Sequence, residues 1–336
     1  MEPNYIYKAL KMSNAPSRIL KILRETKAAE ERLPLMAQTS GSRFFLQPHP
    51  SDRVCLFFHG FTALPEQFVP IGVAFFQAGY NVLIPLLPGH GVAGEWDGDN
   101  PPPLPENQKI YQDFGLHWLE IAQSLGEKVI VGGLSGSGTL VAWLALERPK
   151  QIYRTLAFAP YFGSNTVVDL FVRIFNIYFK WITKPEVTHF GYEGFVMPAL
   201  RVFLDMGADV LEQAQKTSAA PMLIFSSESD LSVDRKDHEA LFEAVLQFQP
   251  RSWYIRFNQA LDIPHNMMTV AEGNEHQDLV IAIAKAFVES DLTWGEVVAI
   301  SDRLKQGYLF HTAINELQLS HRVAPELAAM MAIIDL

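Results

Sequence analysis

The chain has 336 residues, of which 49% are hydrophobic and 19% are charged, so it can bury a large core. Its formal net charge of −10 has the wrong sign for a general nucleic-acid binder, which needs clustered cations. The single cysteine, Cys55, lies in an apolar run, allows no internal disulfide and fits a reducing compartment. Length alone suggests about two domains of roughly 150 residues, although α/β enzymes often exceed 200 residues as one domain.

The amino-terminal segment lacks the continuous apolar core of a signal peptide, and no stretch reaches the roughly 18 apolar residues of a membrane span. We therefore expect a cytoplasmic protein. Residues 17–33 (SRILKILRETKAAEERL) combine apolar and basic side chains. A helix docked on its own domain is the favoured interpretation, and peripheral contact with a membrane surface is the alternative.

After this arm, apolar runs and turn residues predict strands that alternate with helices. In chain order we expect a strand at 42–48, a strand at 53–60, a helix at 65–80, a strand at 81–87, a Gly- and Pro-rich loop at 89–105, a helix at 110–126, a strand at 127–135, a helix at 138–149 and a strand at 153–160. Alternation of this kind is typical of a parallel sheet.

The alternation stops after residue 160 and resumes near residue 221. The intervening segment contains the aromatic-rich stretch 171–182 (FVRIFNIYFKWI), for which we predict helical structure. Beyond it we expect a strand at 221–227, a helix at 234–248, a strand at 252–257 and a helix at 277–290. The prediction is a helical arm (1–42), an α/β catalytic domain (43–290) with a helical cap inserted at about 162–216, and a C-terminal helical extension (291–336).

Ser135 lies between a buried strand and a helix, in VIVGGLSGSGTL, with small residues on both sides. A tight strand-to-helix turn lifts the serine oxygen clear of the backbone, and the helix N-terminus favours negative charge beside it. This makes Ser135 the candidate nucleophile. A Gly/Ser-rich loop without chemistry and a simple helix cap are the alternatives, and a phosphate loop lacks its lysine ending.

A second loop, FFHGFTALPEQF, ends the first buried strand. There the backbone N–H of Phe61 is predicted to act with that of Gly136 as an oxyanion hole.

Five motifs in order carry a resemblance to the α/β-hydrolase superfamily, within it to the carboxylesterase and monoacylglycerol-lipase-like group. They are HGFT at 59–62, AGYNVLIPLLPGHG at 78–91, GLSGSG at 133–138, PMLIFSSESDLSV at 221–233 and PHNMM at 264–268. The resemblance covers roughly residues 43–290. It implies an α/β-hydrolase fold and a serine hydrolase that cleaves small-molecule carboxylic esters without a metal or organic cofactor.

The resemblance also implies the two partners of the nucleophile. The family's acid falls on Asp230, with Glu228 and Asp234 as nearby alternatives, and its histidine falls on His265. The chain order Ser, Asp, His is the order that this fold uses. The other histidines include His238 and His276, in or beside helices. Two more, His59 and His90, match family positions; we interpret these two as braces of their loops rather than catalytic groups.

Two positions depart from the family's pattern. Ser137 stands where the motif usually has glycine, and Ser226-Ser227 stands where the strand before the acid usually ends in His-Gly. Neither departure removes a catalytic group.

The cap is predicted to lie over the carboxyl ends of the strands, where Phe171, Phe175 and Phe179 would line an apolar acyl pocket for medium-chain or lipid-like esters. Helices packed only for stability are the alternative. A thioesterase or acyltransferase would use the same triad, and a non-catalytic receptor or scaffold would not keep it. Dehalogenases and epoxide hydrolases place an aspartate where this chain has Ser135.

Overall fold

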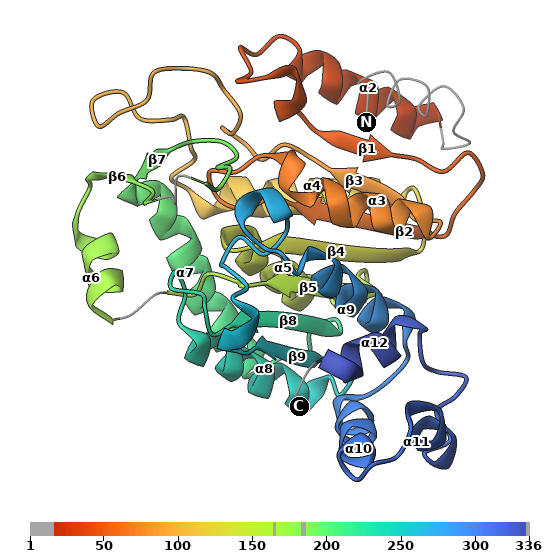
Figure 1. Ribbon diagram of the computed structural model, residues 1–336. Coiled ribbons are helices and arrows are strands. Elements are labelled where there is room, and N and C mark those ends of the chain that lie inside the picture. Colours follow the sequence, from red (N-terminus) through yellow and green to blue (C-terminus); the bar gives the residue numbers. More distant parts are fainter. Residues whose placement is uncertain (1–16, 164–165, 183–185, 334–336) are drawn as a thin grey trace.

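Seven strands form the central sheet of the computed structural model, which describes residues 17–163, 166–182 and 186–333. They are β1 (Arg43–Phe45), β2 (Arg53–Phe58), β3 (Asn81–Ile84), β4 (Lys128–Leu134), β5 (Arg154–Phe158), β8 (Met222–Ser227) and β9 (Trp253–Phe257). Their order across the sheet is β1-β3-β2-β4-β5-β8-β9 (Figure 1). All neighbours are parallel except β1, which is antiparallel to β3. The predicted mostly parallel sheet is confirmed.

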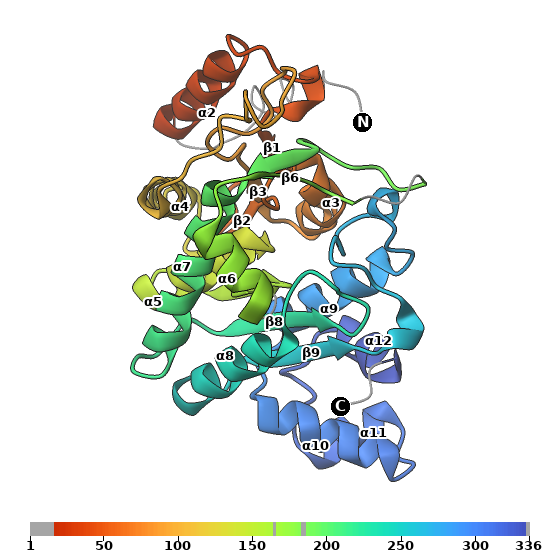
Figure 2. The ribbon, with the colours of Figure 1, turned by 90° about the vertical axis from the view of Figure 1, so that its left-hand side faces the viewer.

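Helices cover both faces of this sheet. They are α3 (Val69–Gln77), α4 (Gln108–Gln123), α5 (Gly136–Glu147), α8 (Arg235–Phe248) and α9 (Gln277–Glu289). Figure 2 shows α3 and α9 on one side and α4, α5 and α8 on the other. Every residue of β3, β5 and β8 is buried, which explains why these strands are nearly continuous apolar runs in the sequence.

The insertion between β5 and β8 is the segment predicted to form the cap, and within it the helical prediction for residues 171–182 is wrong in part. Helix α6 (Thr166–Ile174) ends early, and β6 (Tyr178–Lys180) pairs antiparallel with β7 (Gly194–Val196) before the long helix α7 (Met197–Ala214). The aromatic run continues as a strand because pairing places Phe179 opposite Phe195, and aromatic side chains pack well across paired strands.

The N-terminal helix α2 (Ser17–Glu30) docks on the catalytic domain. Its side chains Ile19 and Leu23 are buried, and the Glu30 carboxylate accepts the Ser42 N–H at 2.9 Å. These contacts favour the docked interpretation of this segment. Residues 1–16 of the predicted arm lie outside the described residues.

The chain ends in three helices beyond the sheet. They are α10 (Trp294–Lys305), α11 (Phe310–Glu316) and α12 (Glu326–Ile333). Four short 3₁₀ helices lie in the connections: η1 (Gln38–Ser40), η2 (Pro65–Phe68), η3 (Gln259–Leu261) and η4 (Val270–Glu272). Across the described ranges, no helix combines the length and the apolar character needed to cross a membrane.

Candidate active site

Three loops that carry polar side chains leave the same edge of the sheet. Ser135 directly follows β4, Asp230 lies shortly after β8, and His265 lies in the segment after β9. The strands β4, β5, β8 and β9 are parallel neighbours. Because carboxyl ends of parallel strands share one edge, these loops meet where open α/β sheets bind ligands.

Ser135 occupies a strained turn between β4 and α5. Its φ of 57° and ψ of −121° lie in a region that a residue with a side chain rarely adopts. Two backbone hydrogen bonds hold the turn: Ser135 N–H donates to Phe158 O at 2.9 Å, and Tyr161 N–H donates to Ser135 O at 3.1 Å. Such a turn projects the serine hydroxyl at the N-terminus of a helix.

Close packing explains the small residues around this turn. A Cβ at Gly133 would lie 2.2 Å from the Ser137 carbonyl oxygen, and one at Gly136 would lie 2.9 Å from the Phe203 ring. Ser137, one of the departures from the family's pattern, is buried, and its hydroxyl donates to the His59 carbonyl at 2.6 Å. This bond ties the turn to the loop after β2.

His265 and Asp230 form a hydrogen-bonded pair, with 2.7 Å between Nδ1 and Oδ2. The second Asp230 oxygen accepts the Ser232 N–H at 2.7 Å. Burial disfavours the Asp230 carboxylate, but the charge and hydrogen bond of His265 outweigh burial and lower the carboxyl pKa. Burial also disfavours charged His265, yet Asp230 raises the imidazole pKa above its ordinary value. The bond leaves Nε2 of His265 as the nitrogen able to accept a proton.

The Ser135 hydroxyl and the His265 imidazole have no hydrogen bond between them within residues 17–163, 166–182 and 186–333. The contact between a serine and its base often tightens only when substrate binds. The structure therefore brings the two residues to one edge of the sheet, and pairs His265 with Asp230 alone.

The backbone N–H groups in the loop formed by residues 59–62 differ in whether they have an acceptor. Gly60 N–H donates to Gln67 Oε1 at 2.7 Å, and Thr62 N–H donates to His90 Nε2 at 3.1 Å. Between them, the Phe61 N–H has no acceptor among the described residues, and neither has the Gly136 N–H at the start of α5. Unused N–H groups of this kind are the donors that an oxyanion hole requires.

The histidines His59 and His90 brace this loop. His59 Nε2 accepts the Leu87 N–H at 3.1 Å, and His90 accepts the Thr62 N–H described above. Burial lowers the pKa of both imidazoles, that of His90 to about 4, so both are neutral at ordinary pH. These contacts agree with the bracing role expected from the sequence.

The cap also contacts the 59–62 loop directly. Trp181 Nε1 donates to Thr62 Oγ1 at 2.9 Å, and Tyr192 N–H donates to Thr62 O at 2.9 Å. Thr62 has a φ of 65°, a left-handed conformation that these contacts help to hold. The position of the loop therefore depends on the cap.

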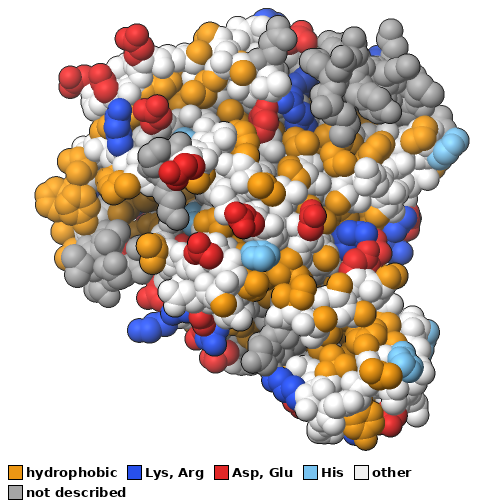
Figure 3. Space-filling model, viewed as in Figure 1, with side chains coloured by type: hydrophobic (Ala, Val, Ile, Leu, Met, Phe, Trp, Pro, Cys, Tyr) orange, Lys and Arg blue, Asp and Glu red, His pale blue; other side chains and the backbone are white. Residues whose placement is uncertain are grey.

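The three phenylalanines predicted to line an acyl pocket lie in two different environments. The rings of Phe171 and Phe175 pack against each other in a tilted arrangement, with 4.6 Å between their centres, and the two residues are 39% and 46% exposed. Phe179 is more covered and packs against Phe195, which in turn packs edge-on against Phe61. Figure 3 shows hydrophobic side chains gathered on this cap side of the molecule. Of the three, only Phe179 belongs to the aromatic cluster that reaches the 59–62 loop.

The alternative acids and histidines have other partners. Glu228 forms an ion pair with Arg256, and Asp234 caps α8 by accepting the Lys236 N–H at 2.9 Å. His238 is buried between the Ser226 hydroxyl and the Pro160 carbonyl. His276 is exposed and immediately precedes α9. None of these four pairs as His265 and Asp230 do.

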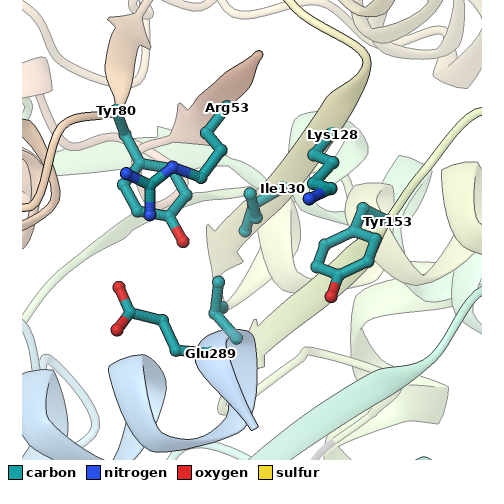
Figure 4. A pocket seen from close by; sticks show the side chains of 7 residues that line it. Arg53, Tyr80, Lys128, Ile130, Tyr153 and Glu289 are labelled. Carbon is teal, nitrogen blue, oxygen red and sulfur yellow. The ribbon is translucent and has the colours of Figure 1, made fainter. Parts of the chain in front are cut away.

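A surface cavity of about 290 Å³ lies at the opposite edge of the sheet. It is lined by residues that include Arg53, Tyr80, Lys128, Tyr153 and Glu289, where β2, β4 and β5 begin (Figure 4). Arg53 lies 4.5 Å from the centre of the Tyr80 ring. The cavity is thus separate from the loops that carry Ser135 and His265.

Two buried polar residues near the loops that carry Phe61 and His265 were not predicted from the sequence. They are Gln67 and Glu272. They form a side-chain hydrogen bond of 2.7 Å although 205 positions separate them. Gln67 lies in the segment FFHGFTALPEQF but outside the five family motifs, and Glu272 lies outside both, so only the three-dimensional arrangement reveals the contact.

Comparison with known proteins agrees with this geometry. A family model described as the alpha/beta hydrolase family matches residues 55–310. The chain belongs to the α/β-hydrolase family. The matched span includes the Ser135 turn and the Asp230–His265 pair, and the resemblance inferred from the sequence is confirmed.

Individual relatives are lipases and esterases. The thermostable monoacylglycerol lipase of Bacillus sp. (strain H-257) is 25% identical over 195 residues, which cover 56% of this chain and 75% of the relative. A structure from a study of the metagenome-derived lipolytic enzymes LipS and LipT has a TM-score of 0.60 at 18% identity and covers 76% of this chain and 98% of that chain. The Paleococcus ferrophilus monoacylglycerol lipase has a TM-score of 0.57 at 17% identity, covering 74% and 97%.

A soluble variant of the Saccharomyces cerevisiae monoglyceride lipase, solved with a substrate analogue, has a TM-score of 0.57 at 14% identity and covers 74% of this chain and 90% of that chain. At these identities the solved structures show a shared fold. The family match and the monoacylglycerol lipase relative support a lipase- or esterase-like α/β hydrolase.

Proposed function

We propose that the chain hydrolyses carboxylic esters through an acyl-enzyme, with Ser135 as nucleophile, His265 as general base and Asp230 as the acid that orients it. The observation that carries the proposal is the 2.7 Å bond from His265 to a buried aspartate, at the sheet edge where the strained Ser135 turn also lies. The lipolytic relatives point to the same reaction class.

In the acylation step, Ser135 Oγ attacks the ester carbonyl while His265 Nε2 takes the serine proton. The carbonyl oxygen becomes an oxyanion, which the N–H groups of Phe61 and Gly136 would stabilise. When the intermediate collapses, the bond to the alkoxy group breaks and His265 returns the proton to the departing alcohol. The acyl group is then bonded to Ser135.

In the deacylation step, a water molecule repeats the attack. His265 takes a proton from the water and the new oxyanion forms. Its collapse breaks the bond between the acyl carbon and Ser135 Oγ, which takes the proton from His265, and the carboxylic acid is released. Asp230 stays ionised throughout, because its lowered pKa keeps the carboxylate available to stabilise the imidazolium. We propose that the substrates are esters with medium-length or lipid-like acyl groups, which fit the aromatic cap.

A hydrolysis panel tests the reaction class. The purified chain should cleave p-nitrophenyl butyrate, and Ser135→Ala should lower kcat by at least about a thousandfold with the fold intact. The exposed Ser124, which immediately follows α4, provides a matched control, and Ser124→Ala should retain activity. A chain that cleaves an acyl-CoA thioester far better than any ester would instead be a thioesterase. Full activity in Ser135→Ala would refute the proposed nucleophile.

A further inference from the structure

A buried carboxylate links the two loops that the proposed reaction uses. Glu272 is 3% exposed and lies in η4, just beyond the loop that carries His265. Its Oε1 accepts the Gln67 Nε2 amide hydrogen at 2.7 Å, and its Oε2 accepts the Thr269 hydroxyl at 3.0 Å. Both carboxylate oxygens therefore have a donor, which a buried charge requires.

Gln67 extends this link to the 59–62 loop. Its side chain is buried, and its Oε1 accepts the Gly60 N–H at 2.7 Å. Because a backbone N–H can only donate, the amide oxygen must face Gly60 and the amide NH2 must face Glu272. The direction of the chain of hydrogen bonds is thus fixed, and it ends on an acceptor at Glu272.

The neighbouring residue in that loop is Phe61, whose N–H has no acceptor among the described residues. Holding Gly60 in place fixes the peptide next to this donor. An error of about 1 Å in the position of such a group costs on the order of a hundredfold in rate. The hydrogen bonds through Gln67 therefore bear on the rate of the chemical step.

We propose that Glu272 is a positioning residue, which holds the 59–62 loop through Gln67 and places a second negative charge near His265. This role rests on the proposed hydrolase function. In this role Glu272 acts through Gln67 and through its charge rather than by contact with the reacting atoms.

The titratable groups around His265 agree with the proposed electrostatic effect of Glu272. His265 is hydrogen-bonded to Asp230 in the loop after β8, and it interacts electrostatically with Glu272 in η4 and with His238 in α8. Burial lowers the pKa of His238 to about 4, so it is neutral where an esterase works. Burial raises the pKa of Glu272 to about 7, against the opposing effect of its hydrogen bonds and of His265. Glu272 is therefore ionised from about neutral pH upward, and its ionised form adds to Asp230 in raising the pKa of His265.

Two substitutions distinguish the effect of the hydrogen bond between Glu272 and Gln67 from the effect of the Glu272 charge. Glu272→Gln keeps the length of the side chain and an acceptor for Gln67 but removes the charge. Glu272→Asp keeps the charge but withdraws the carboxylate by one methylene from Gln67. The exposed Glu275, in the same loop, provides the matched control Glu275→Gln.

We expect Glu272→Gln to move the acid limb of the pH profile of kcat/KM for p-nitrophenyl butyrate downward by about half a pH unit, because His265 loses a neighbouring charge. We expect Glu272→Asp to lower the plateau kcat by about tenfold with little change in KM or in the midpoint, because the loop next to Phe61 is released. Glu275→Gln should change neither quantity.

Wild-type kcat and midpoint in both Glu272 variants would overturn the role, as would equal changes in Glu275→Gln. If Glu272→Gln does not fold, the kcat of Glu272→Asp still decides whether the link matters. An inactive wild-type chain would refute the proposed function itself, which distinguishes that failure from a failure of the role of Glu272.

Discussion

In the proposed mechanism, His265 determines the pH range in which Ser135 can lose its proton. Only the neutral imidazole can accept this proton, and Asp230 raises the imidazole pKa against the effect of burial. Activity should therefore be low at acidic pH and should rise with pH through that raised pKa. The pH dependence of kcat/KM measures this apparent pKa.

The control for this prediction is a histidine outside the pair. His265→Ala should abolish hydrolysis, whereas the exposed His276, replaced by alanine, should leave the profile unchanged. Equal damage from both substitutions would show that the general base has been assigned to the wrong loop.

The Ser137 hydroxyl is expected to contribute to the stability of the fold. This buried hydroxyl donates to the His59 carbonyl at 2.6 Å, so Ser137→Ala leaves that carbonyl without this donor. The free energy of unfolding, measured by urea denaturation, should fall by about 1–2 kcal/mol. Ser124→Ala, at an exposed position, should change it much less, and an equal loss in both variants would contradict the importance of the Ser137 bond.

The cap is the element that should set acyl-chain selectivity. Each buried methylene contributes about 0.8 kcal/mol, so a chain four carbons longer than acetyl gains up to on the order of a hundredfold in kcat/KM while the pocket can accommodate it. We expect p-nitrophenyl octanoate to be preferred over the acetate. Comparison of kcat/KM for the acetate, butyrate, octanoate and palmitate esters measures the preference.

Within the cap, the aromatic positions should not contribute equally. Phe179 belongs to the cluster that reaches Phe61 through Phe195, whereas Phe175 is 46% exposed. Phe179→Ala should therefore reduce the preference for octanoate more than Phe175→Ala. A profile that peaks at acetate and is unaffected by either substitution would mean that these aromatic side chains serve only to stabilise the cap.

The elements that the sequence predicted well are those whose signal is local. The strands β2, β4 and β8 are short apolar runs bounded by turn residues, and burial on both faces makes such runs visible without any knowledge of the fold. The strand β6 was not predicted, because it exists only through pairing with β7, which lies beyond a connecting segment. Its aromatic residues suit a helix or a strand equally well at short range.

The whole molecule brings together residues that no local pattern connects. The sequence indicated Ser135, Asp230 and His265 as candidates because motifs in family order carry them, and the structure pairs the last two. It did not identify Gln67 and Glu272, whose contact spans 205 positions and depends on how η4 packs beside the loop after β2. Both residues lie outside the five family motifs, and their role is recognised only through burial and hydrogen-bond partners.

Labelling with a fluorophosphonate tests the central claim most directly, because the reagent reacts with a serine that its own active site has activated. We expect one adduct per chain, located on Ser135 by fragmentation of the modified peptide and absent in Ser135→Ala. An adduct on Ser137, or unchanged labelling of Ser135→Ala, would contradict it.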